Sequence, residues 1–211
     1  MFGQLALVAG LALCWSGIVH AQAAAKPELA KAQATAQQVC AACHAADGNS
    51  PTPANPHIAG QYPEYLTKQL MNFKPQGGKK AERENAVMAG MVANLSPEDM
   101  KNLAAFYAGQ KLKPASAKDK KLAAQGQKLY RGGNPGTGVA ACAGCHGPDG
   151  LGMPSQYPRI SGQYAEYVEL QLKAFKSGAR ANDPNGMMRG VAAKMSDAEI
   201  KAVSEYVAGL R

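Results

Sequence analysis

A five-residue pattern occurs twice in this chain of 211 residues: two cysteines separated by two residues and followed at once by a histidine. The copies are residues 40–44 (CAACH) and 142–146 (CAGCH). This is the pattern that attaches a c-type haem. The spacing lets both sulfurs form thioethers to one porphyrin edge and places the histidine under the metal. The sequence therefore predicts two covalent haem c groups, each with its iron.

Two other interpretations of the cysteine motifs have weaker support. A redox dithiol of the thioredoxin type sits near a βαβ pattern, and no β-rich segment flanks either copy. A structural zinc site needs four protein ligands, whereas each motif supplies two cysteines and one histidine. Haem attachment is the better interpretation of both motifs.

The N-terminal segment has the character of a secretory signal peptide. Residues 1–25 carry no charge, and the apolar run Leu5–Leu13 is followed by small residues near Ala21 and Ala23. We expect a leader over residues 1–23 and export to the periplasm. An uncleaved anchor is the alternative, although Leu5–Val19 is shorter than the roughly 20 residues of a membrane span. Cleavage removes Cys14 and leaves four cysteines, all within the two motifs.

The second half of the chain repeats the first. Residues 56–65 (PHIAGQYPEY) return as residues 158–167 (PRISGQYAEY), displaced by 102 like the cysteine motifs. After Lys74 the displacement falls to 100, which puts two extra residues of the first copy between Lys74 and Met88. Two copies are too few for a solenoid. They predict two domains, residues 24–112 and 113–211, joined by a polar linker over residues 110–118.

Each copy is predicted to be all-α. Residues 28–39 are rich in helix formers, and residues 64–73 show helical spacing of apolar side chains. Ser96 and Ser196 each precede acidic residues and should cap the last helices. Ser116 with Asp119 resembles a capping box for the helix before the second motif, with Gly126 weakening its middle.

These domains are small, and alanine makes up much of their apolar content. The fold class is therefore a tandem duplication of a small helical domain, each copy built around one covalent haem that completes its core.

The second axial ligand decides the chemistry, because histidine with methionine suits electron transfer and an open position suits ligand binding or catalysis. Alignment of the copies pairs Met88 with Met188, and every other methionine pairs with a different residue; Met91, for example, aligns with Val191. We therefore predict Met88 and Met188 as iron ligands opposite His44 and His146.

Other residues near the motifs have supporting roles. His57 competes with Met88 as a ligand, but its counterpart is Arg159, and we interpret it as a surface or propionate-facing residue. The carbonyls of Pro56 and Pro158 could accept the Nδ1–H of the axial histidines and so fix the rings. Four tyrosines are interpreted as packing against the haem edge with hydrogen-bonded hydroxyls, rather than as an electron relay: Tyr62, Tyr65, Tyr164 and Tyr167.

With the paired cysteine motifs, the paired methionines, the two P-x-I-x-G-Q-Y segments and the stretch MRGVAAKMS at residues 188–196, the chain resembles the dihaem cytochrome c4 family. The resemblance covers essentially all of the chain after the leader. It implies two class I cytochrome c domains related by a pseudo-twofold axis, with haem propionates facing each other. It also implies thioether bonds at four cysteines and four axial ligands, and the chain matches all eight positions: Cys40, Cys43, Cys142 and Cys145; His44, Met88, His146 and Met188.

The same resemblance implies a periplasmic electron carrier and not an enzyme, with no catalytic residue. Its partners would be a donor such as a quinol-oxidising complex and an acceptor such as a haem-copper oxidase, and peripheral membrane association is left open. The alternative is the electron-accepting subunit of a dehydrogenase such as a sulfide-oxidising flavocytochrome. A catalytic dihaem peroxidase or sulfur-compound oxidase is disfavoured, because both irons have two predicted ligands.

The net charge of +8 does little to distinguish between these candidate functions. It is spread over the chain, with +3 over residues 26–113 and +5 over residues 114–211. A basic surface is compatible with steering towards an acidic partner or an anionic lipid face. Nucleic acid is not an expected partner of an exported protein.

The cysteine assignment gives a first prediction. The purified mature protein should contain two covalent haems and no free thiol, because all four remaining cysteines form thioethers. Pyridine haemochrome absorbance with a thiol assay on the denatured protein measures both quantities. One haem per chain, or zinc in place of iron, would contradict the assignment.

Overall fold

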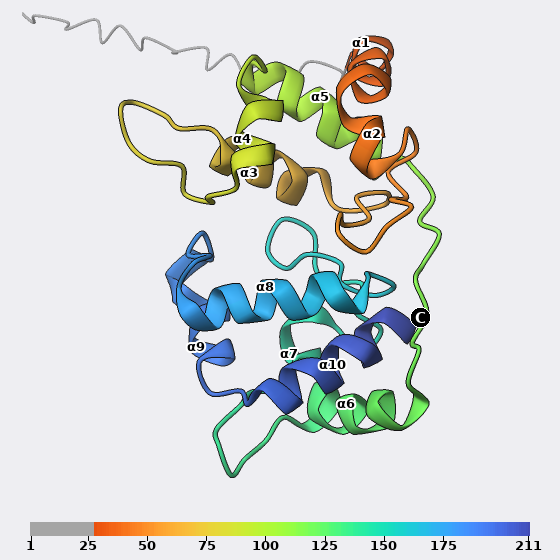
Figure 1. Ribbon diagram of the computed structural model, residues 1–211, viewed down its shortest axis with the longest axis vertical. Coiled ribbons are helices and arrows are strands. Elements are labelled where there is room, and N and C mark those ends of the chain that lie inside the picture. Colours follow the sequence, from red (N-terminus) through yellow and green to blue (C-terminus); the bar gives the residue numbers. More distant parts are fainter. Residues whose placement is uncertain (1–27) are drawn as a thin grey trace, which may run out of the picture.

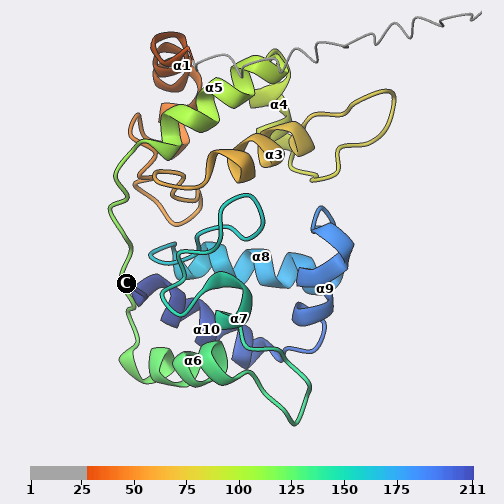
Figure 2. The ribbon, with the colours of Figure 1, turned by 180° about the vertical axis from the view of Figure 1, so that it is seen from behind.

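The computed structural model describes residues 28–211, and the predicted leader with Cys14 lies outside them. Two helical domains are stacked along the long axis of the molecule and joined by an extended linker on one side (Figures 1 and 2). Within residues 28–211 there are isolated bridges but no strands. No helix in this range is long and apolar enough to cross a membrane. The all-α duplicated fold is as predicted.

The first domain is built on its last helix. Helices α1 and α3 both pack against α5, and α4 packs against α3. Its buried apolar side chains form two clusters, one centred on Leu103 and Tyr107 and the other on Phe73 and Met100. The elements are α1 (Leu29–Thr35), a π-helical turn (Ala36–Cys40), α2 (Ala41–His44), α3 (Pro63–Phe73), α4 (Ala86–Val92) and α5 (Pro97–Ala108).

The second domain repeats this arrangement. Helices α6 and α8 pack against α10, and α9 packs against α8. One cluster forms its core, with Tyr130, Ile200 and Val207 almost fully buried. The elements are α6 (Lys120–Gly132), α7 (Ala143–His146), α8 (Ala165–Ser177), a 3-10 turn (Pro184–Gly186), α9 (Met187–Ala192) and α10 (Asp197–Gly209).

The predicted starts of the final helices are confirmed. Ser96 accepts a hydrogen bond from the backbone of Asp99, and the Asp99 carboxylate accepts one from the backbone of Ser96. Ser196 and Glu199 form the same reciprocal box at α10. These boxes satisfy backbone donors that the first turn of a helix leaves unpaired.

The predicted start of α6 is wrong by three residues. The cap is Asp119, whose carboxylate accepts from the backbone of Leu122 at 2.9 Å. Ser116 belongs to the linker, which is held extended because the Ala115 N–H donates to the Gly162 carbonyl at 2.8 Å. The linker is therefore docked on the second domain before the helix can begin.

Gly126 has a packing role that its helix propensity does not reveal. It is buried in α6 where α10 crosses most closely, and a Cβ placed on it would lie 2.0 Å from the carbonyl oxygen of Ala202. Only glycine permits this approach, so a residue that weakens an isolated helix is required by the helix pair.

The two domains meet through a reciprocal pair of glutamines. The Gln61 side chain donates to the carbonyl of Arg159 at 2.7 Å and accepts from the N–H of Arg159 at 3.0 Å. Gln163 binds the backbone of His57 in the same way, at 2.8 and 3.0 Å. Positions 57 and 159 are equivalent, as are 61 and 163. The contacts therefore obey an approximate twofold symmetry within one chain.

The close crossing at Gly126 gives a second prediction. Gly126→Ala should lower the free energy of unfolding of the haem-loaded protein by about 1–3 kcal/mol, because the helices must separate. Gly132→Ala is the matched control in the same helix, since a Cβ there meets nothing within 4 Å. Denaturant titration followed by circular dichroism measures both. Equal stability of the two variants would show that the crossing can relax.

Candidate haem-binding sites

Each cysteine motif forms the short helix that ends in its histidine. Cys40 directly precedes α2 and Cys142 directly precedes α7, and the histidine is the last helical residue in both. The chain then turns sharply, with φ of 59° at Ala45 and 77° at Gly147. One helical turn thus carries both sulfurs and the imidazole, as attachment to a single porphyrin requires.

The two imidazoles are buried and held in one orientation. Nδ1 of His44 lies 2.9 Å from the carbonyl oxygen of Pro56, and Nδ1 of His146 lies 3.0 Å from that of Pro158. A carbonyl can only accept, so Nδ1 carries the proton and Nε2 keeps a free lone pair. The predicted hydrogen bonds to proline are confirmed. Burial lowers the pKa of both histidines, which favours the neutral form that binds metal.

Two of the thiols lack the acidity of a reactive dithiol. Burial raises the pKa of Cys40, and it raises the pKa of Cys142 to about 11. The reactive cysteine of a redox dithiol has a lowered pKa instead. Within the described part of the chain, no group of three or more histidine, cysteine, aspartate or glutamate side chains could hold a metal ion. The donor set fits a haem, which brings four ligands of its own.

The paired methionines occupy equivalent short helices. Met88 lies in the first turn of α4 and packs against the Phe73–Met100 cluster, and Met188 lies in the first turn of α9. Both are half-buried, whereas their neighbours Met91 and Met187 are 44% and 41% exposed. Met88 and Met188 remain the proposed ligands.

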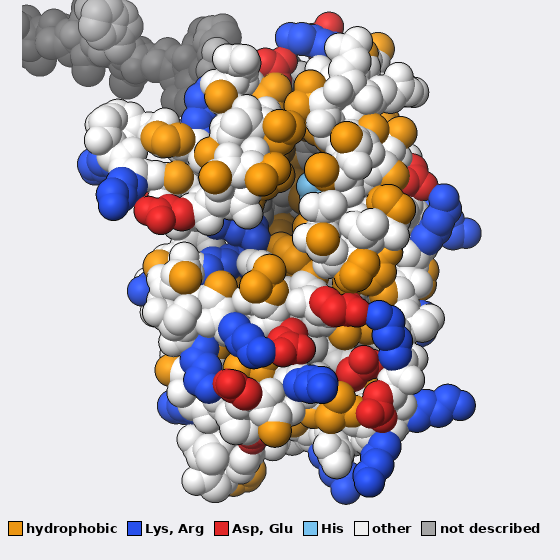
Figure 3. All heavy atoms as spheres, viewed as in Figure 1, with side chains coloured by type: hydrophobic (Ala, Val, Ile, Leu, Met, Phe, Trp, Pro, Cys, Tyr) orange, Lys and Arg blue, Asp and Glu red, His pale blue; other side chains and the backbone are white. Residues whose placement is uncertain are grey.

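Apolar surface surrounds the first site. Figure 3 shows hydrophobic side chains gathered around a hollow in the N-terminal domain, with a histidine visible inside it. Val87 and Val39, on the elements that carry the candidate ligands and cysteines, are 62% and 37% exposed. Large exposed apolar side chains on a small domain indicate a surface that is covered by something apolar. A macrocycle attached at one edge fits this setting.

His57 is not a surface residue. Its side chain is only 8% exposed, because it stacks on Tyr164 of the other domain with ring centroids 4.2 Å apart. Because this burial depends on a residue of the other domain, the sequence around His57 does not predict it. The hydroxyl of Tyr164 in turn donates to the carbonyl of Ser50 at 2.7 Å.

Two buried arginines lie at the domain interface and were not among the residues predicted from the sequence. Arg83 lies over the ring of Phe73, and Arg180 lies over the ring of Phe175, at 4.6 and 4.5 Å. The two arginines are equivalent, because their backbone N–H groups donate to the backbone carbonyls of residues 72 and 174, which are displaced by 102. Their own displacement is 97, so alignment by a constant offset misses the pair. A phenylalanine at or near the end of a helix, followed by an arginine in the next loop, was the available signal.

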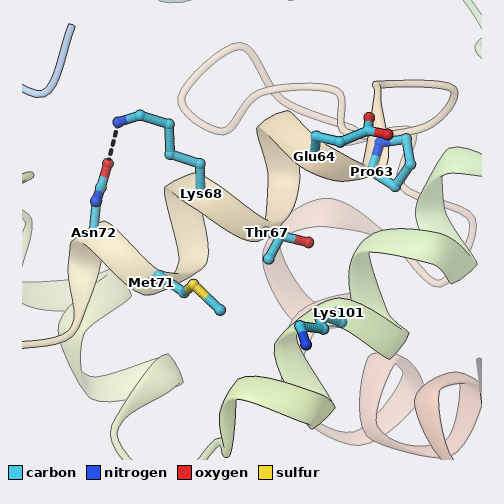
Figure 4. A pocket seen from close by; sticks show the side chains of 7 residues that line it. All are labelled: Pro63, Glu64, Thr67, Lys68, Met71, Asn72 and Lys101. Atoms are coloured by element: carbon cyan, nitrogen blue, oxygen red, sulfur yellow. Dashed lines mark hydrogen bonds between the residues drawn. The ribbon is translucent and has the colours of Figure 1, made fainter. Parts of the chain in front are cut away.

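A separate shallow hollow of about 530 Å³ lies along α3 and contains neither motif. Figure 4 shows its lining, in which Lys68 reaches along the helix to Asn72. It lacks the cysteine and histidine ligands of a haem site. Its residues are Pro63, Glu64, Thr67, Lys68, Met71, Asn72 and Lys101.

Comparison with known proteins identifies the same two units. The family model for cytochrome c matches residues 29–110 and 123–211. A cytochrome c4 from Thiocapsa roseopersicina is 49% identical over 192 residues, covering 89% of this chain and 96% of that protein. The crystal structure of reduced recombinant cytochrome c4 from Pseudomonas stutzeri superposes with a TM-score of 0.82 at 41% identity, covering 88% of this chain and 100% of that one.

A relative with a different name is also similar. The thiosulfate dehydrogenase electron acceptor of Thiomonas intermedia is 39% identical over 189 residues, covering 88% of this chain and 81% of that protein.

The methionine assignment gives a third prediction. Met88→Ala should lower the potential of one haem and allow it to bind carbon monoxide, because an iron ligand is lost. Met188→Ala should do the same to the other haem. Optical titration with carbon monoxide and spectroelectrochemistry measure both effects. The exposed neighbours Met91 and Met187, changed to alanine, are the controls; opening of a haem by either control would overturn the assignment.

Proposed function

This chain belongs to the cytochrome c4 family of dihaem electron-transfer proteins, and from that premise we propose that it carries electrons through the periplasm to a haem-copper terminal oxidase. Each of its two cytochrome c domains binds one haem c, which supplies reversible one-electron chemistry when bound.

The observation that supports a carrier most directly is the equivalence of the two sites. The same hydrogen bond orients both histidines, and a half-buried methionine lies on the same short helix in both copies. A catalytic dihaem protein instead needs one haem with an open position. With two protein ligands on each iron, the protein would move electrons without binding substrate.

We assign the ligands accordingly, residue by residue. His44 and His146 would bind iron through Nε2 while the proline carbonyls hold Nδ1–H, and Met88 and Met188 would supply the second protein ligand of each iron. The thioethers would anchor each porphyrin to its domain. They form at Cys40, Cys43, Cys142 and Cys145.

The predicted leader supports the proposed export to the periplasm, and the positive charge supports docking on acidic partners. A leader over residues 1–23 would export the chain, and covalent haem attachment then follows in the periplasm. The domains are proposed to span residues 24–112 and 113–211. A net charge of +8 favours acidic docking surfaces on a donor such as a quinol-oxidising complex and on the oxidase.

A second candidate function is favoured by one comparison. The relative from Thiomonas intermedia is named as the electron acceptor of a thiosulfate dehydrogenase. This chain could receive electrons from a sulfur-compound dehydrogenase by the same sites. The two roles differ in the donor, and a single protein could serve both.

The oxidase role gives a fourth prediction. The reduced protein should be oxidised by membranes containing a haem-copper oxidase, and the second-order rate constant should fall about tenfold or more between low and high salt. Stopped-flow spectroscopy measures the rate, and reduction by a neutral hydroquinone is the control that salt should barely affect.

Oxidation by these membranes no faster than by oxygen alone would exclude the oxidase as partner. If thiosulfate dehydrogenase with thiosulfate then reduced the protein rapidly, the second candidate would replace the first.

A further inference from the structure

The buried hydroxyl of Tyr107 has no hydrogen-bond partner among residues 28–211. Its side chain lies in the core of the first domain, near the end of α5, and is only 3% exposed. Burying a hydroxyl without a partner is costly, and most buried tyrosine hydroxyls form a hydrogen bond. An unpaired hydroxyl in this core therefore points to a partner that becomes available only in the mature protein.

The position of this hydroxyl is fixed by packing around the ring. A Cβ placed on Gly48 would lie 2.8 Å from Cδ1 of Tyr107, so the ring lies directly against that backbone. The ring of Phe106 meets it edge-on, with centroids 5.1 Å apart. A flip of the ring leaves the hydroxyl oxygen where it is, because that oxygen lies on the flip axis. The hydroxyl therefore cannot seek a distant acceptor without repacking of the core.

The polar group beside the hydroxyl is the sulfur of Cys40. Cys40 packs against the apolar cluster to which Tyr107 belongs, although the two groups do not yet meet in hydrogen-bond geometry. Burial raises the pKa of the Cys40 thiol, and the Tyr107 hydroxyl partly offsets this effect, as a donor to sulfur does. Burial also raises the pKa of Tyr107, so the hydroxyl keeps its proton and remains a donor.

The acid whose charge reaches Tyr107 is bound by other residues. Asp47 accepts from Nζ of Lys113 in the linker at 2.8 Å and from the backbone N–H of Asn49 at 3.0 Å. The hydrogen bond from Lys113 is the main reason that the pKa of Asp47 lies at about 2. The Cys40 sulfur is therefore the acceptor that best fits the Tyr107 hydroxyl.

The second domain has no hydroxyl at the equivalent position. The backbone N–H of Gly60 donates to the carbonyl of Tyr107 at 2.9 Å. The N–H of Gly162 donates in the same way to the carbonyl of Val207 at 3.0 Å. Positions 107 and 207 are therefore equivalent, and the second carries an apolar side chain.

The buried tyrosine of the second domain uses its hydroxyl elsewhere. Tyr130 on α6 belongs to the same cluster as Val207, and Cys142 packs against that cluster. The Tyr130 hydroxyl donates to the carbonyl of Gly147 at 2.6 Å. A buried tyrosine hydroxyl without a partner beside the first cysteine of a motif is thus a property of the first domain, within residues 28–211.

We propose that the Tyr107 hydroxyl donates a hydrogen bond to the Cys40 sulfur of the mature protein and so tunes the first haem separately from the second. The inference rests on the proposed thioether at Cys40 and not on which partner exchanges electrons with the protein. A thioether sulfur has no hydrogen of its own, so it can only accept. A hydrogen bond to it withdraws electron density from the attached porphyrin, which favours reduced iron. Tyr107 is therefore a positioning residue that raises one of the two reduction potentials.

The test removes only the hydroxyl, in the protein with two covalent haems. Tyr107→Phe should lower the equilibrium constant for reduction of one haem about threefold and leave the other unchanged. For a one-electron couple a tenfold change is 59 mV, so the expected shift is about 28 mV. Spectroelectrochemical titration measures both potentials, and pyridine haemochrome absorbance confirms that both haems are attached.

A matched control is available on the equivalent helix. Tyr206 on α10 is half-buried and stands where α5 carries Phe106, with its ring centroid 5.2 Å from that of Tyr130. Tyr206→Phe makes the same chemical change one position earlier in the helix, and should leave both potentials unchanged.

Resonance Raman spectroscopy tests the hydrogen bond in the unaltered protein. Exchange into heavy water should shift the carbon–sulfur stretching band of one thioether, because deuterium replaces the hydroxyl proton, and Tyr107→Phe should abolish this shift. If the variant fails to accumulate with two haems, the measurement on the wild-type protein carries the test.

Unchanged potentials in Tyr107→Phe would overturn the proposal. A higher free energy of unfolding in that variant would overturn it as well, because removal of a hydroxyl that has no partner stabilises a core. So would an equal shift of potential in Tyr206→Phe, or a wild-type carbon–sulfur band that heavy water does not move. A wild-type protein with fewer than two covalent haems would instead contradict the cysteine assignment, which the haemochrome spectrum tests independently.

Discussion

The hydrogen bond from each axial histidine candidate to a proline carbonyl links the cofactor site to the pairing of the domains. Pro56 holds the ring of His44, and the N–H and carbonyl of the next residue, His57, are bound by Gln163 from the other domain. Pro158 and Gln61 repeat the connection from the opposite side. The backbone segment that fixes the imidazole is therefore also bound by the other domain. A displacement of the imidazole would move a segment whose next residue forms the contact between the domains.

The small apolar cores are the reason to expect that the fold depends on bound haem. In the first domain the buried side chains divide into two clusters, and large apolar side chains such as Val87 remain exposed. A haem brings an apolar macrocycle that fits against these side chains, so that the cofactor would contribute to the core of each domain.

Sequence was sufficient wherever a local rule decides the structure. The cysteine motifs, the Ser96 and Ser196 capping boxes and the proline carbonyl acceptors depend on neighbours a few residues away or on a strict repeat. Sequence was insufficient where contacts with the other domain or with the linker determine the structure. His57 is covered by Tyr164, docking of the linker moves the start of α6 to Asp119, and unequal loops hide the equivalence of Arg83 and Arg180. Gly126 likewise needed the position of α10.

The central claim is that each domain holds one low-spin haem between a histidine and a methionine. Near-infrared magnetic circular dichroism of the fully oxidised wild-type protein tests it most directly, because methionine-to-iron charge transfer gives a band whose intensity counts methionine-bound haems. We predict intensity for two such haems in each chain, unchanged on addition of carbon monoxide to the reduced protein and reoxidation. Intensity for one haem or none would contradict the claim.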